Sequence, residues 1–271
     1  MVDELLALAT RLAADAGALL LEGLGRSRIA VATKSSPTDV VTAFDRASEV
    51  LITEGLRAAR PDDAILAEEG TEHPGTSGVR WLVDPLDGTV NFLYGLSVFG
   101  VSLAAEVDGT VEVAVVGVPA HDETFTAVRG RGAWLNGRRL RCTAVSDLSE
   151  ALVGTGFSYR PERRLLQARM LTGVIPAVRD IRRAGAAAVD LCWVGAGRLD
   201  AFYEHGLQPW DLAAGALVAA EAGAVVGDLD GGPASSRLTV AAAPGIAPAF
   251  RALLADAGRD PPLRHSGTSP P

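Results

Sequence analysis

The stretch VDPLDGTVNF, residues 83–92, places two aspartates around a proline directly after the apolar run WLV. Pro85 fixes its own φ and keeps Asp84 extended, so the carboxylates of Asp84 and Asp87 can splay around one ion or bridge two. The Leu86 carbonyl between them is a third possible oxygen ligand. Taken alone, the same string also predicts an ordinary turn. Features elsewhere in the chain are therefore needed to distinguish a turn from a metal site.

The residues that follow Asp87 favour a site. Gly88 and Thr89 begin a turn or a short helix, and free backbone N–H groups at such a start can bind an anion. A phosphate pocket is therefore expected next to the two aspartates.

Further acidic residues follow apolar runs or begin helices elsewhere in the chain. Glu68 and Glu69 follow the run AILA, Asp45 ends the segment TAFD, and Asp211 follows QPW. Each of these alone is an ordinary strand end or helix cap. Together they predict hard oxygen ligands that converge at one sheet edge, as Mg²⁺ requires.

Composition limits the class of protein. The 271 residues are 48% hydrophobic with a formal net charge of -8, which allows a large core and argues against a nucleic-acid binder. Cys142 and Cys192 have no zinc-ligand spacing, and a disulfide framework is implausible. The N-terminal segment carries charges among its leucines and matches neither a signal peptide nor a membrane span. We therefore expect a reduced, cytoplasmic enzyme.

The pattern of apolar residues changes along the chain. The first half of the chain begins with two expected helices. The first runs from the N-terminus to about Gly23, and the second is capped by Asp39 or Thr42 and ends near Arg60. A run of short strands follows, with hairpin turns at 108–109 and 136–137. After about Ser146 strands alternate with helices. We predict an N-terminal α+β half over 1–145 with most metal ligands, a C-terminal α/β half over 146–257 with Asp211 and the substrate contacts, and a disordered tail over 258–271.

At these residues the sequence resembles the inositol monophosphatase family, over about residues 5–255. WLVDPLDGTVNF (81–92) is similar to the family's first signature, W-x-[IV]-D-P-[IL]-D-G-T-x-N-F, and PWDLAAGALVAAEAGA (209–224) to its second. The remaining similar stretches, in the same order as in the family, are KSSPTDVVTAFD, ILAEEG, GRGAWLNGRRL and RRAGAAAVDLCWVGAGRLDAFYEHG. The resemblance implies a mixed α and β fold, an αβαβα five-layer sandwich of the inositol monophosphatase and fructose-1,6-bisphosphatase type.

The resemblance also implies a lithium-sensitive, Mg²⁺-dependent phosphatase with two or three ions per site. Glu68, Asp84 and the Leu86 carbonyl would hold the first metal, Asp84, Asp87 and Asp211 the second, and Glu68 would reach a third through water. Thr89, hydrogen-bonded to Asp45, would orient and deprotonate the attacking water, so Thr89, Asp45 and Glu68 are the expected catalytic residues. Lys34 matches a family lysine near the metals.

The expected substrate contacts come from both halves. The backbone N–H groups of Gly88 and Thr89 would bind the phosphate. Asp87, the backbone of Gly185 and Ala187, and the Glu204 carboxylate would bind the alcohol portion. Gly185-Ala186-Ala187 lacks a hydroxyl that many relatives carry there, which concerns substrate preference and not the reaction. For the basic pair Arg182 and Arg183, a position at the site mouth and one on the surface both stay open.

The expected activity is hydrolysis of inositol 1-phosphate, with a small phosphorylated polyol as ligand, a homodimer as the assembly, and no nucleic-acid or membrane partner. Histidinol phosphate, fructose 1,6-bisphosphate and 3′-phosphoadenosine 5′-phosphate are alternative substrates on the same scaffold. A non-catalytic binding module and a Ca²⁺-binding structural domain are the alternatives from other classes. The intact acidic residues argue against the first, and the absence of EF-hand spacing argues against the second.

Overall fold

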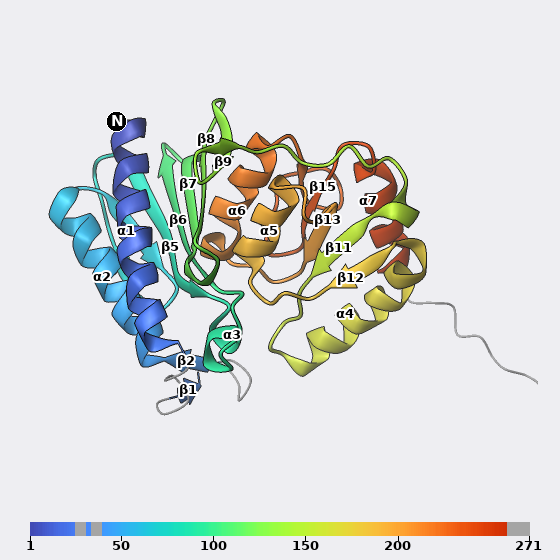
Figure 1. The fold of residues 1–271 in the computed structure, drawn as a ribbon, viewed down its shortest axis with the longest axis horizontal. Helices are drawn as coiled ribbons and strands as arrows, with labels where there is room; N and C mark the ends of the chain where they lie inside the picture. The colour runs from blue at the N-terminus through green and yellow to red at the C-terminus, as the bar shows by residue number, and fades with distance from the viewer. Residues whose placement is uncertain (25–30, 34–39, 259–271) are drawn as a thin grey trace, which may run out of the picture.

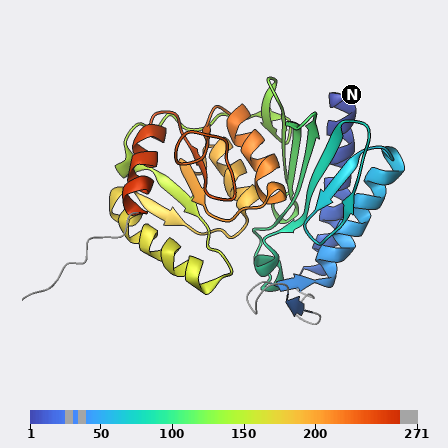
Figure 2. The same cartoon turned by 180° about the vertical axis from the view of Figure 1, so that it is seen from behind.

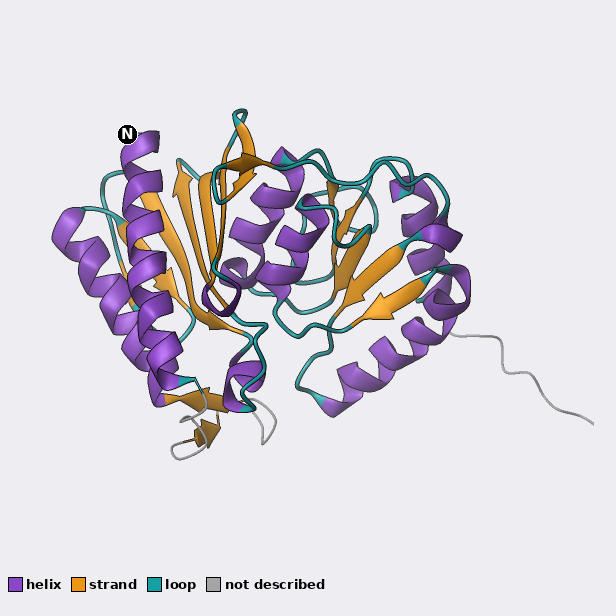
Figure 3. Ribbon diagram, viewed as in Figure 1, coloured by secondary structure: helices purple, strands orange, loops and turns teal. Residues whose placement is uncertain are grey.

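The computed structural model describes residues 1–24, 31–33 and 40–258. The chain stacks as five layers, in the order helices, sheet, helices, sheet, helices (Figures 1 and 3). The mixed α and β class and the αβαβα layering expected from the sequence are confirmed. Seen from behind, the same layers run in reverse order from left to right (Figure 2).

The first outer layer consists of α1 (Val2–Gly23) and α2 (Ala43–Ala59). Leu5, Leu12 and Leu20 of α1 are fully buried or nearly so, because their spacing puts them on the helix face toward the sheet. Thr42, one of the two caps expected from the sequence, begins α2, and its hydroxyl accepts the backbone N–H groups of Phe44 and Asp45. The other expected cap, Asp39, lies outside the described residues.

The first sheet has eight strands in the order β10-β9-β8-β7-β6-β5-β3-β4, and its pairs are antiparallel except β3 with β5. The hairpin turns expected at Asp108-Gly109 and Asn136-Gly137 are present, with positive φ at all four residues. The strands are β3 (Ala64–Ala67), β4 (Glu72–His73), β5 (Val79–Asp87), β6 (Gly100–Val107), β7 (Thr110–Val118), β8 (Glu123–Val128), β9 (Gly132–Leu135) and β10 (Arg138–Arg139).

The middle helices α5 (Ala187–Gly195) and α6 (Pro209–Glu221) lie between the two sheets (Figure 1). Gly215 of α6 lies where the two helices touch. A Cβ on Gly215 would lie 2.7 Å from Leu191 Cβ, so a glycine at this position lets the two helices approach closely. Because both helices begin at the same end of the layer, their first turns lie near the site described below.

The second sheet has five strands in the order β12-β11-β13-β15-β14. β11 pairs in parallel with β12 and β13, whereas β15 is antiparallel to β13 and β14. The strands are β11 (Leu152–Thr155), β12 (Asp180–Arg182), β13 (Ala201–Glu204), β14 (Val225–Gly227) and β15 (Thr239–Ala242), and the outer helices are α4 (Pro161–Val174) and α7 (Ala247–Ala257).

Smaller elements complete the chain. The short helix α3 (Thr89–Leu93) follows β5, β1 (Val31–Thr33) pairs with β2 (Val40–Thr42), and 3-10 turns occupy Pro119–His121, Leu148–Glu150 and Ile175–Ala177. The chain passes from the first sheet to the second between β10 and β11, close to the expected boundary at 145/146, and this boundary stays a prediction. The disordered tail also stays a prediction, because residues 259–271 lie outside the described residues. Among the described helices, none is long and apolar enough to cross a membrane.

Candidate active site

The stretch VDPLDGTVNF begins in the last part of β5, where the strand meets the middle helices. The register of β5 against β6 shifts between Asp84 and Asp87, so the proline lies in a strand irregularity. Leu86 donates its backbone N–H to Asp84 Oδ1 at 3.0 Å, and Ser48 of α2 donates to the Pro85 carbonyl at 2.8 Å. The segment is thus both a turn and the support of two buried carboxylates.

Asp87 lies at the N-terminus of α5. Its Oδ1 accepts the Ala187 N–H at 3.0 Å, and its Oδ2 accepts the N–H groups of Ala188 and Val189 at 2.8 and 3.3 Å. Burial raises the pKa of Asp87 to about 7, although these three donors lower it. The Ala187 N–H, expected to contact substrate, is therefore engaged by Asp87.

Glu68 follows β3, and its backbone N–H donates to the Val83 carbonyl at 3.1 Å. Its turn is held by Glu49, which accepts the Glu69 N–H at 2.7 Å and the Thr71 hydroxyl at 2.6 Å. Glu49 was missed by the sequence reasoning. The available signal was its spacing, because Glu49 lies one helical turn beyond Asp45 and therefore on the same face of α2.

Asp45 and Thr89 are brought together as expected, with Thr89 Oγ1 2.9 Å from Asp45 Oδ1. The other oxygen of Asp45 accepts both the backbone N–H and the hydroxyl of Thr42, at 2.8 and 2.5 Å. Burial raises the pKa of Asp45, and hydrogen bonds from Thr42 and Thr89 oppose that effect. Thr89 Oγ1 also lies 3.1 Å from the Leu86 carbonyl, which ties the expected catalytic pair to the expected carbonyl ligand.

Asp211 is the third residue of α6, and its Oδ2 accepts the Gln208 N–H at 2.7 Å as part of a capping box. Burial, followed by the charge of Glu68, raises its pKa well above the ordinary value. For Asp84, burial is again the main cause of a raised pKa, and the charges of Glu68, Asp87 and Asp211 add to it. The four acidic residues predicted as ligands, Glu68, Asp84, Asp87 and Asp211, therefore interact electrostatically, although they come from three separate segments.

The donor set fits a hard divalent cation. Burial and mutual repulsion disfavour the charged form of these carboxyl groups. A divalent cation between them would stabilise that charged form. No group of three or more His, Cys, Asp or Glu side chains in the described part of the chain is arranged to hold a metal ion as it stands. Asp84, Asp87 and Asp211 each accept a backbone N–H instead, and their ligand roles stay predictions.

The residues expected on the substrate side lie in the second half of the chain. Gly185 has φ +89°, and a Cβ there would lie 2.2 Å from an Arg183 guanidinium nitrogen. Glu204 ends β13 and lies against Gly156, where a Cβ would be 2.0 Å from Glu204 Oε2. Burial raises the pKa of Glu204 to about 8, and the positive charge of Arg183 opposes the shift. Arg182 instead forms an ion pair with Asp180 on the surface.

Two further residues near the site, Asn91 and Asp190, were given no role by the sequence reasoning. Asn91 of α3 donates to the carbonyls of Val98 and Ala184, at 2.6 and 2.8 Å, and so connects the two halves of the chain. Asp190 of α5 is buried, and its Oδ1 has no hydrogen-bond partner among the described residues. Lys34, which the resemblance placed near the metals, lies outside the described residues.

The layered fold and the buried carboxylates beside a threonine–aspartate pair define a phosphatase of the inositol monophosphatase type. A model described as the inositol monophosphatase family matches residues 1–259. The chain therefore belongs to the inositol monophosphatase family.

Individual relatives agree with this assignment. The inositol-1-monophosphatase SuhB of Mycobacterium tuberculosis is 47% identical over 266 residues, 91% of each chain. The Nus factor SuhB of Pseudomonas aeruginosa is 44% identical over 236 residues, 85% of this chain and 87% of the relative. The solved structure of extragenic suppressor protein suhB from Bartonella henselae superposes with a TM-score of 0.87 at 39% identity, covering 92% of this chain and 97% of that one.

Proposed function

We propose that this protein hydrolyses inositol 1-phosphate to myo-inositol and phosphate, with two or three Mg²⁺ ions held by Glu68, Asp84, the Leu86 carbonyl, Asp87 and Asp211. The observation that carries the proposal is the 2.9 Å contact of Thr89 Oγ1 with Asp45 Oδ1, directly after the buried Asp84 and Asp87 of β5. It is supported by the relatives named inositol-1-monophosphatase, 47% identical to this chain.

Water attacks a phosphate monoester slowly, because the ester is already negatively charged. The chemistry supplied by bound Mg²⁺ is neutralisation of that charge, a lowered pKa of the attacking water and stabilisation of the departing alkoxide. The chain's own contribution is the Thr89–Asp45 pair. A hydroxyl has one proton, so Thr89 donates it to Asp45 and keeps its lone pairs for the water. Asp45, held by Thr42 and made more basic by burial, is the group that accepts the proton.

The remaining roles are those that the family resemblance implies. Gly88 and Thr89 present backbone N–H groups to the phosphate. Asp87, the Gly185 backbone and Glu204 bind the hydroxyl-bearing portion, and Ala187 acts there through the hydrogen bond that it donates to Asp87. Glu204 ends β13 with its carboxyl group against Gly156, and a hydrogen bond from a ring hydroxyl would stabilise this buried carboxyl group.

Other substrates on the same metal cluster are histidinol phosphate, fructose 1,6-bisphosphate and 3′-phosphoadenosine 5′-phosphate. The test is phosphate release from these three and from inositol 1-phosphate, with and without MgCl₂. We expect Mg²⁺-dependent turnover with the highest kcat/KM for inositol 1-phosphate. A strong preference for histidinol phosphate would overturn the substrate, and no release with any ester would overturn the activity.

The relatives named Nus factor SuhB are almost as similar to this chain as those named for the phosphatase. The percentage of sequence identity therefore does not show whether this chain acts as a phosphatase or has a different, non-catalytic role. The buried carboxyl groups favour the enzyme, because each one is costly to bury without a ligand or substrate to stabilise it. The same MgCl₂ assay decides between the two.

A further inference from the structure

The exposed side chain of Arg183 folds back over the backbone of Gly185. The two residues lie in the loop between β12 and α5. A Cβ on Gly185 would lie 2.2 Å from a guanidinium nitrogen of Arg183, and Gly185 has φ +89°. Only a glycine combines this backbone angle with the space that the guanidinium group occupies. The loop therefore holds the charge of Arg183 close to its own backbone.

Gly185 in turn lies against the backbone that we expect to bind phosphate. A Cβ on Gly88 would lie 3.4 Å from the Gly185 carbonyl oxygen. Asn91 of α3 donates to the Ala184 carbonyl at 2.8 Å, which fixes the loop on the helix that Gly88 begins. Arg183, Gly185 and Gly88 are therefore successive neighbours, from the guanidinium group to the expected phosphate position.

The charge of Arg183 also acts on two carboxyl groups in the second half of the chain. It opposes the raised pKa of Glu204 and of Asp190, each of which is caused mainly by burial. Glu204 is the residue expected to bind the alcohol portion of the substrate. The guanidinium group thus lies within electrostatic reach of this carboxyl group as well as next to the phosphate-binding backbone.

Arg183 has no ion pair among the described residues. Its neighbour Arg182 differs, because Arg182 pairs with Asp180 on the surface. A guanidinium group carries five N–H donors. Those of Arg183 are therefore available to a ligand, whereas Arg182 already has an anionic partner.

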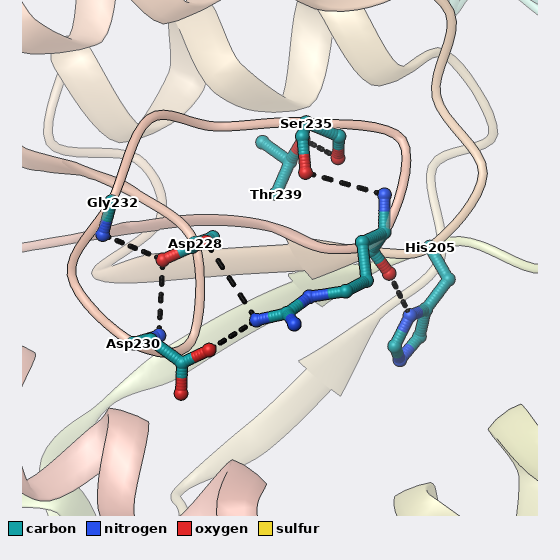
Figure 4. Close-up of polar contacts among 7 residues, drawn as sticks. His205, Asp228, Asp230, Gly232, Ser235 and Thr239 are labelled. Carbon is teal, nitrogen blue, oxygen red and sulfur yellow. Dashed lines mark hydrogen bonds and ion pairs between the residues drawn. The ribbon is translucent and has the colours of Figure 1, made fainter.

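Arg237, which precedes β15, is engaged elsewhere (Figure 4). Its guanidinium group pairs with Asp230, and its carbonyl oxygen is hydrogen-bonded to His205 Nδ1. Because His205 directly follows Glu204, these contacts fix the end of β13 and leave the Glu204 carboxyl group without a cationic partner from this loop. Arg183, and not Arg237, is therefore the cation that can act together with Glu204.

A carboxylate and a guanidinium group offer complementary partners to a hydroxyl group. The hydroxyl can donate a hydrogen bond to the carboxylate and accept one from the guanidinium group. We propose that Arg183 is a specificity-determining residue that binds, together with Glu204, the hydroxyl groups of the alcohol portion, so that the enzyme prefers phosphate esters of polyols to esters without hydroxyl groups. The proposal rests on the function proposed above.

The test compares inositol 1-phosphate with phenyl phosphate, whose alcohol portion carries no further hydroxyl group. Arg183→Gln should lower kcat/KM for inositol 1-phosphate roughly tenfold through KM, since a hydrogen bond to a charged group contributes about 1.5–3 kcal/mol. The kcat/KM for phenyl phosphate should stay at the wild-type value. Arg182→Gln is the matched control, because it removes the adjacent arginine from its surface ion pair, and it should behave as the wild type with both esters.

A double-mutant cycle tests the partnership with Glu204. If both residues bind the same hydroxyl groups, Arg183→Gln should cost less kcat/KM for inositol 1-phosphate in a Glu204→Gln background than in the wild type. Equal losses in the two backgrounds, equal losses for the two esters, or no loss at all would overturn the proposal.

A second arm separates this proposal from the proposed activity. Absence of phosphate release from any ester would count against the activity alone. Calorimetric titration of the same proteins with inositol 1-phosphate in MgCl₂ would then measure binding directly. Weaker binding by Arg183→Gln than by the wild type and Arg182→Gln would support the role of Arg183, and equal binding by all three proteins would overturn it.

Discussion

Thr89 Oγ1 and Asp45 Oδ1 lie 2.9 Å apart although the residues are 44 positions apart in the chain. Asp45 belongs to the capping box of α2, and Thr89 begins α3 directly after the aspartates of β5. The start of one helix thus supplies the acceptor for a hydroxyl at the start of another. The same cap that begins α2 therefore also positions the group that we expect to take the proton during hydrolysis.

Asp45→Asn should lower kcat by about 10²–10⁴-fold, because the amide cannot accept a proton through Thr89. KM for inositol 1-phosphate should change little. Steady-state phosphate release at saturating MgCl₂ measures both constants. Thr42→Val serves as the control, since it removes the cap and keeps the acid, and it should lose more stability than activity. A kcat near the wild-type value in Asp45→Asn would contradict the role of the pair.

Asp84→Asn should make the metal-free protein more stable and the enzyme inactive. The substitution removes one of several repelling buried charges, and the asparagine oxygen can still accept the Leu86 N–H. In EDTA the Tm should rise by about 2–4 °C for each kcal/mol of repulsion relieved, while the Tm increase caused by MgCl₂ should shrink. Asp62→Asn, at an exposed position, is the matched control. A lower Tm in EDTA for Asp84→Asn would refute the repulsion.

The stability of the metal-free protein should fall as pH rises from about 5 to 8. Folding raises the pKa of Glu204 from 4.5 to about 8, mainly through burial, and that of Asp87 to about 7. A carboxyl group with a raised folded pKa stabilises the fold below its unfolded pKa, and this contribution is lost as pH rises through the folded value. Thermal unfolding in EDTA across this range measures the fall. Glu204→Gln should flatten it, and Glu22→Gln, at an exposed position on α1, should not.

Gly156→Ala should raise KM for inositol 1-phosphate more than it lowers kcat. A Cβ at this position would lie 2.0 Å from Glu204 Oε2, so the carboxyl group has to move away from β11. Gly117→Ala is the control, because its Cβ would meet only ordinary contacts, with nearest atoms at 3.7 Å. The idea fails if the KM values of the Gly156→Ala variant and the wild type agree while both proteins keep their Tm.

Much of the fold was predictable, because strong local signals agree with the final packing. The periodicity of α1, the Thr42 cap and the two hairpin turns with glycine each act over a few residues. The short strand β4, with two residues, was not predicted. It forms because β3 offers it hydrogen bonds near the sheet edge, and a two-residue segment is too short to show a strand pattern in the sequence.

The site residues that belong to one sequence motif were predictable. The contacts that depend on backbone from distant parts of the chain were not. Asp84, Asp87 and Thr89 belong to one stretch, and the Thr89–Asp45 contact followed from the family resemblance. The engagement of Asp87 by the first turn of α5 was not foreseen, because it depends on how a middle helix meets β5. Asn91, which connects the two halves, was missed for the same reason.

We propose that the acidic residues around Asp84 hold divalent cations that act on a phosphate. The most direct measurement is an anomalous difference map from a crystal soaked in Mn²⁺ and inorganic phosphate, since Mn²⁺ takes the same hard oxygen ligands as Mg²⁺. We expect at least two peaks within ligand distance of Asp84, one near Glu68 and the Leu86 carbonyl and one near Asp87 and Asp211. A map with no peak among these residues would contradict it.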